Sequence, residues 1–250
     1  MTAYYNEIDP YAAQWLRNLI TEKLIAPGDV DERSIAEVNA SDLAGYTQCH
    51  FFAGIGGWSY ALRLAGWPDD KPVWTGSCPC QPFSAAGKGA GFADERHLWP
   101  SWFHLISECQ PMRVFGEQVA NALAWLDLVS TDLEAKGYAI GATIMGAHSI
   151  GAPHIRQRLY WVADSAGPWR CGWATLEGAR SSELGRPSPH ILPGPWPGDA
   201  GSSSTVLTSE LCAPSYGLPG RVGLLRGYGN AIVPQVAAEF IKAAQWALTG

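Results

Sequence analysis

Short apolar runs alternate with stretches of helical periodicity along most of this chain. The runs that favour strands are residues 3–5, 47–52, 73–75, 113–115, 138–145 and 158–163. The segments that favour helices are residues 10–22, 57–64, 97–109, 122–136 and 233–248. Because strand and helix patterns follow one another, the sequence predicts an α/β fold with a doubly wound, mostly parallel sheet.

This alternation stops between residues 164 and about 220, where Gly, Pro, Ser and Trp dominate and periodicity is weak. We therefore expect one large domain, made of residues 1–163 and 228–250, and a small irregular second lobe at 164–227. The chain has 250 residues, 47% of them apolar, which is enough for a sizeable core. A net charge of −6 argues against long-range attraction to nucleic acid but leaves binding in a local cleft open.

Cysteine usage and the N-terminus bear on the compartment. The six cysteines show neither CxxC spacing nor a paired framework, so we expect a reduced, intracellular protein with no metal site. The first ten residues carry Glu7 and Asp9 and lack the apolar core of a signal peptide. The longest uncharged stretch, residues 138–153, is too polar and too short to span a bilayer. We expect a cytoplasmic location, in a prokaryote or phage, and no membrane partner.

Two loops carry candidate chemistry. Pro79-Cys80-Gln81-Pro82 follows a strand, and its prolines hold the Cys80 thiol on a turn at the edge where α/β sheets bind ligands. Ala53-Gly54-Ile55-Gly56-Gly57 joins a strand to a helix through glycines, which lets a ligand approach the backbone at a helix N-terminus. The glycine loop alone is equally compatible with a turn that binds nothing.

Together these loops resemble the cofactor loop and the Pro-Cys-Gln loop of the DNA cytosine-5 methyltransferases. Other segments are similar to that family: residues 87–98, Gly116-Glu117-Gln118-Val119 with Gln in place of Asn, Gly151-Ala152-Pro153-His154-Ile155-Arg156-Gln157-Arg158 with His in place of Gln, and Gly229-Asn230-Ala231-Ile232-Val233-Pro234. The resemblance covers most of the chain outside residues 164–227. It implies a Rossmann-like sheet of the S-adenosyl-L-methionine-dependent type.

The order of the motifs departs from the family. Only one helix fits between the glycine loop and the cysteine loop, where the family has two strand–helix units. The missing motifs resemble segments at the front of the chain, Tyr5-Asn6-Glu7-Ile8-Asp9 for the ribose and Gly28-Asp29-Val30 for the adenine. We therefore predict a rearranged order: second strand, third strand, first strand, then the cysteine strand. If the helix at 57–64 keeps its usual face, its crossover is left-handed, which is rare.

The resemblance implies a role for each motif residue. Cys80 supplies the thiolate that attacks C6 of cytosine, Glu117 binds N3 and the exocyclic amine, and Arg156 or Arg158 provides a positive setting. Glu7 accepts from the ribose hydroxyls, Asp29 accepts from the adenine amine, and Phe52 packs on the adenine. The remaining implied cofactor residues are Ile8, Val30, Gly54, Ile55, Gly56, Gly57, Pro79, Leu98, Asn230 and Ile232.

The predicted activity is transfer of a methyl group from S-adenosyl-L-methionine to C5 of a cytosine flipped out of duplex DNA. Residues 164–227 are then a target-recognition lobe, the protein is expected to be a monomer, and a restriction–modification setting leaves a nuclease partner open. Two alternatives remain: methylation of cytosine in RNA, and an inactive DNA-binding relic. For each candidate residue there is also an interpretation without a function. Cys80 is then an inert buried thiol, and the charged residues are solvated surface charges: Glu7, Glu117, Arg156 and Arg158.

Overall fold

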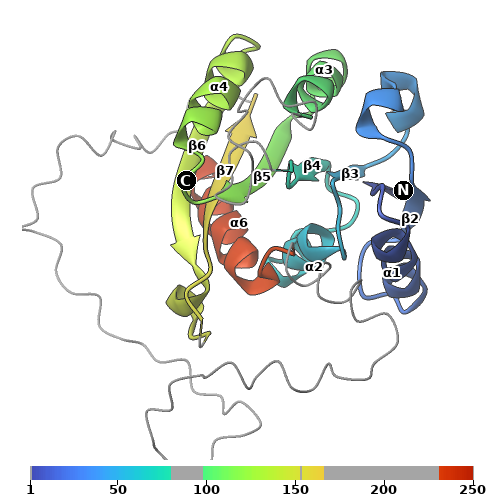
Figure 1. Cartoon of the computed structure of the whole chain (residues 1–250), viewed down its shortest axis with the longest axis horizontal. Helices are drawn as coiled ribbons and strands as arrows, with labels where there is room; N and C mark the ends of the chain where they lie inside the picture. Colours follow the sequence, from blue (N-terminus) through green and yellow to red (C-terminus); the bar gives the residue numbers. More distant parts are fainter. Residues whose placement is uncertain (1, 80–97, 153, 166–230, 250) are drawn as a thin grey trace, which may run out of the picture. The chain divides into compact units, whose positions relative to one another are not determined.

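The computed structural model describes residues 2–79, 98–152, 154–165 and 231–249 (Figure 1). The predicted recognition lobe therefore lies almost wholly outside the described residues. The strands are β1 (Ala3–Asn6), β2 (Gly28–Asp31), β3 (Gln48–Phe51), β4 (Val73–Gly76), β5 (Arg113–Val119), β6 (Ala139–Gly146) and β7 (Gln157–Asp164). The α-helices are α1 (Pro10–Thr21), α2 (Gly57–Leu64), α3 (Trp99–Cys109), α4 (Leu123–Glu134) and α6 (Pro234–Thr249). Short 3₁₀ helices are η1 (Ile35–Glu37), η2 (Ala40–Leu43) and η4 (Ala147–Ile150).

All seven strands belong to one sheet in the order β2-β1-β3-β4-β5-β7-β6. Neighbours from β2 to β5 run parallel, whereas β7 is antiparallel to both β5 and β6. The predicted mostly parallel, doubly wound α/β sheet is therefore confirmed.

The rearranged strand order is also confirmed. The chain enters the sheet at β1, moves outward to β2, returns past β1 to β3, and then proceeds to β4. A parallel sheet requires its strands to lie side by side and does not require them to be consecutive in sequence, provided each crossover is long enough. The connection from β2 to β3, which contains η1 and η2, provides that length.

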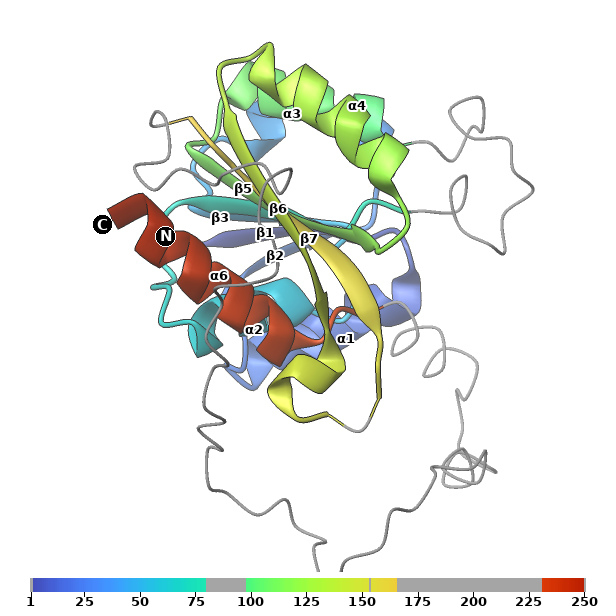
Figure 2. The same cartoon turned by 90° about the vertical axis from the view of Figure 1, so that its left-hand side faces the viewer.

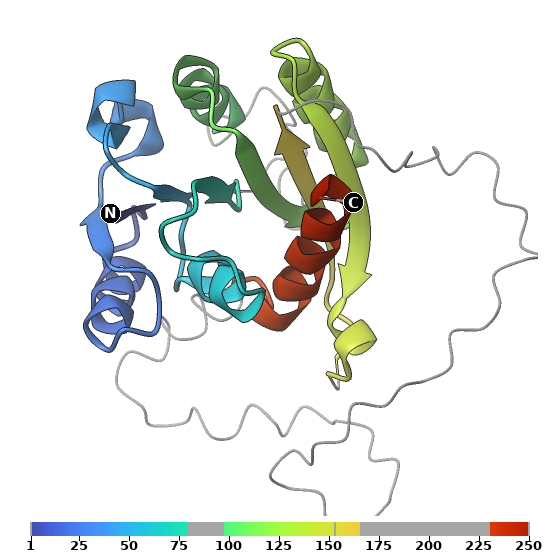
Figure 3. The same ribbon diagram turned by 180° about the vertical axis from the view of Figure 1, so that it is seen from behind.

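Helices cover both faces of the sheet. Helices α1, α2 and α6 lie on one face, and α3 and α4 lie on the other, as the two rotated views show (Figures 2 and 3). The shared face of α1 and α2 is fixed by side chains: Tyr5 Oη of β1 lies 3.0 Å from Ser59 Oγ of α2, and Leu16 of α1 packs in the same cluster as Tyr5. On the opposite face, Ile35 of η1 and Leu43 of η2 pack in the cluster that contains α3 and α4.

These faces settle the hand of the crossover through α2. The β1–α1–β2 connection uses the α1 face and moves toward β2, whereas β3–α2–β4 uses the same face and moves in the opposite direction. The two connections therefore have opposite hands. The β2–β3 and β4–α3–β5 connections agree with β1–α1–β2, and parallel crossovers are right-handed in about 98% of cases. We assign the left hand to β3–α2–β4, so α2 keeps its face and the crossover is the exception.

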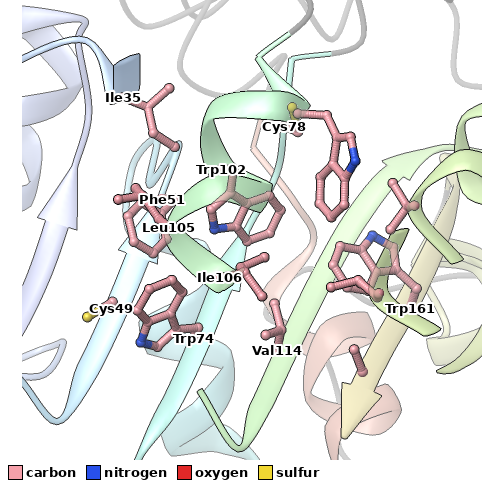
Figure 4. Close-up of a cluster of buried hydrophobic side chains, with 14 of the residues drawn as sticks. Ile35, Cys49, Phe51, Trp74, Cys78, Trp102, Leu105, Ile106, Val114 and Trp161 are labelled. Carbon is pink, nitrogen blue, oxygen red and sulfur yellow. The ribbon is translucent and has the colours of Figure 1, made fainter. Parts of the chain in front are cut away.

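An aromatic cluster fills the α3/α4 side of the core. Trp102 contacts Phe51 of β3 and Trp161 of β7, with ring centroids 6.0 and 5.8 Å apart (Figure 4). The cluster also takes in Trp74, Trp99, Trp125 and Cys78. Large rings stabilise a core through the area they bury, so this cluster holds β3, β7 and α3 firmly against one another. Among the described helices, none combines the length and the apolar character needed to cross a membrane.

Candidate active site

The carboxyl ends of β1 and β3 meet at one edge of the sheet. Glu7 follows β1 and receives two backbone N–H groups: Gly54 N donates to Oε2 at 2.7 Å and Asp9 N donates to Oε1 at 2.9 Å. Burial raises the pKa of Glu7, and these two hydrogen bonds oppose that rise. Glu7 is therefore a partly buried carboxylate that fixes the glycine loop, and the interpretation as a solvated surface charge does not hold.

The glycines of the loop have different surroundings. Gly54 has φ +54°, a conformation that favours glycine, and a Cβ there would meet nothing within 4 Å. Gly56 also has positive φ, and a Cβ there would press on leucine side chains of α1. At Gly57 a Cβ would lie 2.7 Å from Ile232 Cγ1. Gly54 is thus the glycine that leaves open space at the edge, while Gly57 and Ile232 contact each other.

Apolar side chains flank this open space. Ile8 directly follows Glu7 and is 65% exposed, which is unusual for a large aliphatic side chain. Phe52 follows β3 with φ +50°, an uncommon value for a residue with a side chain, and its ring packs edge-on against Trp102 at 5.9 Å. Ile55 of the loop is half-buried. Ile8 and Phe52 therefore lie at the ends of neighbouring strands, where a planar ligand would have apolar contacts.

The predicted adenine residues lie further from the edge. Asp29 and Val30 are inside β2, and Asp29 is paired in register with Tyr4 rather than with the last residue of β1. The exposed Asp29 carboxylate accepts a hydrogen bond from Tyr46 Oη at 2.8 Å, and Val30 packs against the cluster of α1. The structure does not bring Asp29 into contact with Glu7, and its role stays a prediction.

A second polar group lies at the ends of β4, β5 and β7. Glu117 is inside β5 and only 7% exposed, and its Oε1 forms an ion pair with Arg158 Nε at 2.9 Å. The two residues are diagonal neighbours, because Arg158 is opposite Val119 in the antiparallel register. The Ser77 hydroxyl also donates to the Glu117 carboxylate. Burial raises the pKa of Glu117, and the charge of Arg158, the Ser77 hydrogen bond and Arg156 oppose that rise.

Arg156 joins the C-terminal segment to this group. Its Nη2 donates to the carbonyl oxygen of Ala231 at 2.6 Å, next to Ile232. Burial and the neighbouring Arg158 lower the pKa of Arg156. Two guanidinium groups are thus held at the same edge as the buried carboxylate, and neither is a freely solvated charge.

A hydrogen bond and side-chain packing hold the chain after β4 in place just before Cys80. Gln118 Nε2 donates to the carbonyl oxygen of Cys78 at 3.3 Å, and Gln118 Oε1 accepts from the backbone N–H of Val119. The Cys78 side chain is buried in the aromatic cluster. Gln118, which stands where the resembled family has Asn, therefore links β5 to the segment that leads to the candidate nucleophile Cys80.

Not every predicted site residue can be placed. Cys80 and Asn230 lie outside the described residues, whereas Pro79, the residue before Cys80, is described and half-buried. Leu98 is half-buried at the start of α3 and packs against the aromatic cluster. The motif analysis missed Ser77 and Trp58, although both stand within or beside the two motif loops. A polar side chain three residues before the candidate nucleophile was the available signal.

Part of the chain is similar in sequence to known proteins. Residues 67–168 match the family model of the C-5 cytosine-specific DNA methylases. The type II methyltransferase M.AplI of Arthrospira platensis is 33% identical over 104 residues, which are 40% of this chain and 29% of that protein. The type II methyltransferase M.HhaI of Haemophilus parahaemolyticus is 26% identical over 167 residues, which are 50% of this chain and 51% of that protein.

Residues 67–168 are therefore similar to the C-5 cytosine-specific DNA methylases, whose methyl donor is S-adenosyl-L-methionine. The chain's matches span about half or less of these curated relatives. Among solved structures, DNMT2 of Spodoptera frugiperda aligns with a TM-score of 0.46 at 16% identity, over 68% of this chain and 44% of that one.

Proposed function

We propose that this protein transfers a methyl group from S-adenosyl-L-methionine to C5 of a cytosine flipped out of duplex DNA. The observation that carries the proposal is the buried Glu117 carboxylate, paired with Arg158 and joined to Ser77 three residues before Cys80. A buried carboxylate with a raised pKa, beside the chain that leads to a thiol, is suited to recognising a base under attack.

The glycine loop fits the methyl donor. Open space at Gly54 supplies a backbone cradle, and the Glu7 carboxylate can accept hydrogen bonds from hydroxyl groups. The exposed Ile8 and the half-buried Phe52 supply apolar contacts at the same edge. We assign Glu7 to the ribose, and Ile8 and Phe52 to the adenine, with Asp29 as acceptor for the adenine amine. S-adenosyl-L-methionine supplies an electrophilic methyl group when bound.

The protein makes C5 of cytosine able to accept that methyl group. C5 is a poor nucleophile, so the Cys80 thiolate first forms a bond to C6, and the electron pair of the C5–C6 double bond moves to C5. Once C5 carries the methyl group, a base removes the C5 proton, the Cys80–C6 bond breaks and the double bond is restored. We assign to the guanidinium groups of Arg156 and Arg158 the positive setting that favours a thiolate, since positive charge lowers a thiol pKa.

Glu117 acts on the other side of the ring. In its protonated form it donates to N3, and its second oxygen accepts from the exocyclic amine. As Cys80 adds to C6, negative charge develops toward N3, and the proton of Glu117 stabilises it. Because burial raises the pKa of Glu117, the protonated form is more available than it is for a solvated glutamate.

Duplex DNA is the proposed partner. In a duplex the stacked target base hides C6, so the base must be flipped out at a cost of about a few kcal/mol. The net charge of −6 favours recognition through few local contacts, assigned to residues 164–227, over binding by long-range attraction. We propose a monomer acting inside a prokaryotic or phage-infected cell, in a modification system of the type II kind.

The test uses purified protein with methyl-labelled S-adenosyl-L-methionine. Label should enter cytosine C5 of mixed-sequence duplex DNA and should not enter folded RNA of similar composition. DNA containing 5-fluorocytosine should trap a covalent adduct, which Cys80→Ser abolishes while Cys78→Ser retains it. Label in RNA alone would support the RNA alternative, and an absence of both label and adduct would identify an inactive relic.

A further inference from the structure

We propose that Trp58 and Ser77 form a hydrogen-bond relay that orients the Glu117 carboxylate before a base binds. The inference rests on the proposed function, in which Glu117 recognises the target cytosine. Trp58 belongs to α2, Ser77 follows β4 and Glu117 lies in β5, so the relay joins three elements at the carboxyl edge.

The direction of the relay follows from its atoms. Trp58 Nε1 lies 3.1 Å from Ser77 Oγ, and an indole N–H can only donate. Ser77 Oγ therefore accepts from Trp58, which leaves its single proton for the Glu117 carboxylate. Because Trp58 is only 3% exposed and its ring is 6.2 Å from Phe115, the donor is held by the core. The Ser77 hydroxyl is thus pre-aligned to donate to the Glu117 carboxylate.

The relay acts on Glu117 together with groups from β7. Arg158 contacts Oε1 directly, while Arg156 and the Tyr160 hydroxyl also influence the electrostatics around this carboxylate. Arg158 and Tyr160 approach from the neighbouring antiparallel strand β7 and Arg156 from the residue just before it, whereas Ser77 approaches from the side of β4. The carboxylate is therefore held from two directions. Removing the β4 side frees its rotation without removing the ion pair.

Ser77 also links two parts of the proposed reaction. It is three residues before Cys80, and the next residue, Cys78, is held by Gln118 through its carbonyl oxygen. A shift of the segment that carries the nucleophile would therefore alter the hydrogen bond to Glu117. Ser77 and Trp58 are positioning residues, since they act through Glu117.

The direct test is the titration of Glu117, followed by NMR of ¹³C-labelled glutamate side chains and assigned with Glu117→Gln. We expect Ser77→Ala to move the Glu117 midpoint to higher pH, because the carboxylate loses a donor. Trp58→Phe should move it in the same direction by less, and Ser77→Thr, which keeps a hydroxyl, should restore the wild-type midpoint. An unchanged midpoint in Ser77→Ala would overturn the relay, whether or not the protein methylates DNA.

Kinetics provide a second and separate readout. Ser77→Ala should lower kcat for DNA methylation about tenfold and leave the KM for S-adenosyl-L-methionine unchanged, while the high-pH limb of the rate profile moves upward. Equal loss in Ser77→Thr and Ser77→Ala would indicate a purely structural role and would contradict the proposal. If no variant methylates DNA but the midpoints shift as expected, the relay stands and the proposed function fails.

Discussion

The two halves of the sheet present different kinds of groups at the same edge. The N-terminal half (β2, β1 and β3) offers mainly backbone, fixed by one carboxylate, Glu7, that receives two backbone N–H groups. The C-terminal half (β4, β5, β7 and β6) offers side chains: Glu117, Arg158, Arg156, Ser77 and Gln118. A backbone site depends on which strands are neighbours, whereas a side-chain site depends on register between strands.

This difference explains which half of the chain is rearranged. Strands β1, β2 and β3 follow an altered chain order, yet Glu7 still reaches Gly54 because β1 and β3 are adjacent. In the C-terminal half, Glu117 meets Arg158 only because β5 and β7 pair in a fixed antiparallel register. Since a one-residue slip would turn every side chain to the other face, that pairing is strongly constrained.

The largest effect that separates the halves is expected from Glu117→Gln. The amide cannot supply the proton to N3, so kcat should fall by about 10²–10³-fold. Binding of S-adenosyl-L-methionine should stay within about twofold, because that ligand is assigned to the other half. Single-turnover methylation and calorimetric binding measure the two quantities on the same preparation. Similar losses in both would show that the halves are not functionally separate.

The converse change is Glu7→Ala. It removes the carboxylate that holds Gly54 and the proposed acceptor for the ribose, so the Kd for S-adenosyl-L-methionine should rise about 10- to 100-fold. At saturating methyl donor, kcat should change by less than about threefold. Glu22→Ala, which removes an exposed carboxylate at the end of α1, is the matched control and should leave both values unchanged. A loss of kcat with an unchanged Kd would mean that Glu7 serves methyl transfer rather than binding of S-adenosyl-L-methionine.

The motifs indicated the strand order correctly because each one lies within or directly after a particular strand, and the resemblance implied which of these strands are neighbours. They could not decide the hand of the β3–α2–β4 crossover, which depends on Tyr5 and Ser59 meeting on one face. The motifs also could not predict the proposed relay through Trp58 and Ser77. Its geometry depends on side chains from separate elements, and no spacing along the chain encodes it.

Some motif residues turned out to have another visible partner. Gly57 and Ile232 were both assigned to the cofactor from the resemblance, and in the structure a Cβ on Gly57 would collide with Ile232. Asp29 was assigned to the adenine, and its carboxylate accepts from Tyr46. A motif records which residue types occur together, whereas packing decides which of them face a ligand and which face each other.

A pH effect should arise in the N-terminal half. His50 of β3 is buried, its Nδ1 lies 2.8 Å from Thr75 Oγ1, and burial lowers its pKa from 6.5 to about 3. Between those values the unfolded chain binds a proton that the folded protein does not, so stability falls as pH falls. The free energy of unfolding should be about 2 kcal/mol lower at pH 5 than at pH 7 from this residue. Urea unfolding of wild type and His50→Gln at both values measures the difference. An identical pH dependence in the variant would contradict the assignment.

The smallest expected effect tests the contact between the two halves. Gly57 begins α2, and Ile232 lies just before α6, so their contact joins the glycine loop to the C-terminal segment. Gly57→Ala places a methyl group where only 2.7 Å separates the new Cβ from Ile232 Cγ1, which should destabilise the fold by about 1–2 kcal/mol. In Gly57→Ala/Ile232→Ala the added methyl group partly fills the space left by the isoleucine. The combined loss in unfolding free energy should therefore be smaller than the sum of the single losses, by about 1 kcal/mol. Additive losses would mean that Gly57 does not contact Ile232 in solution and that the glycine is needed for another reason.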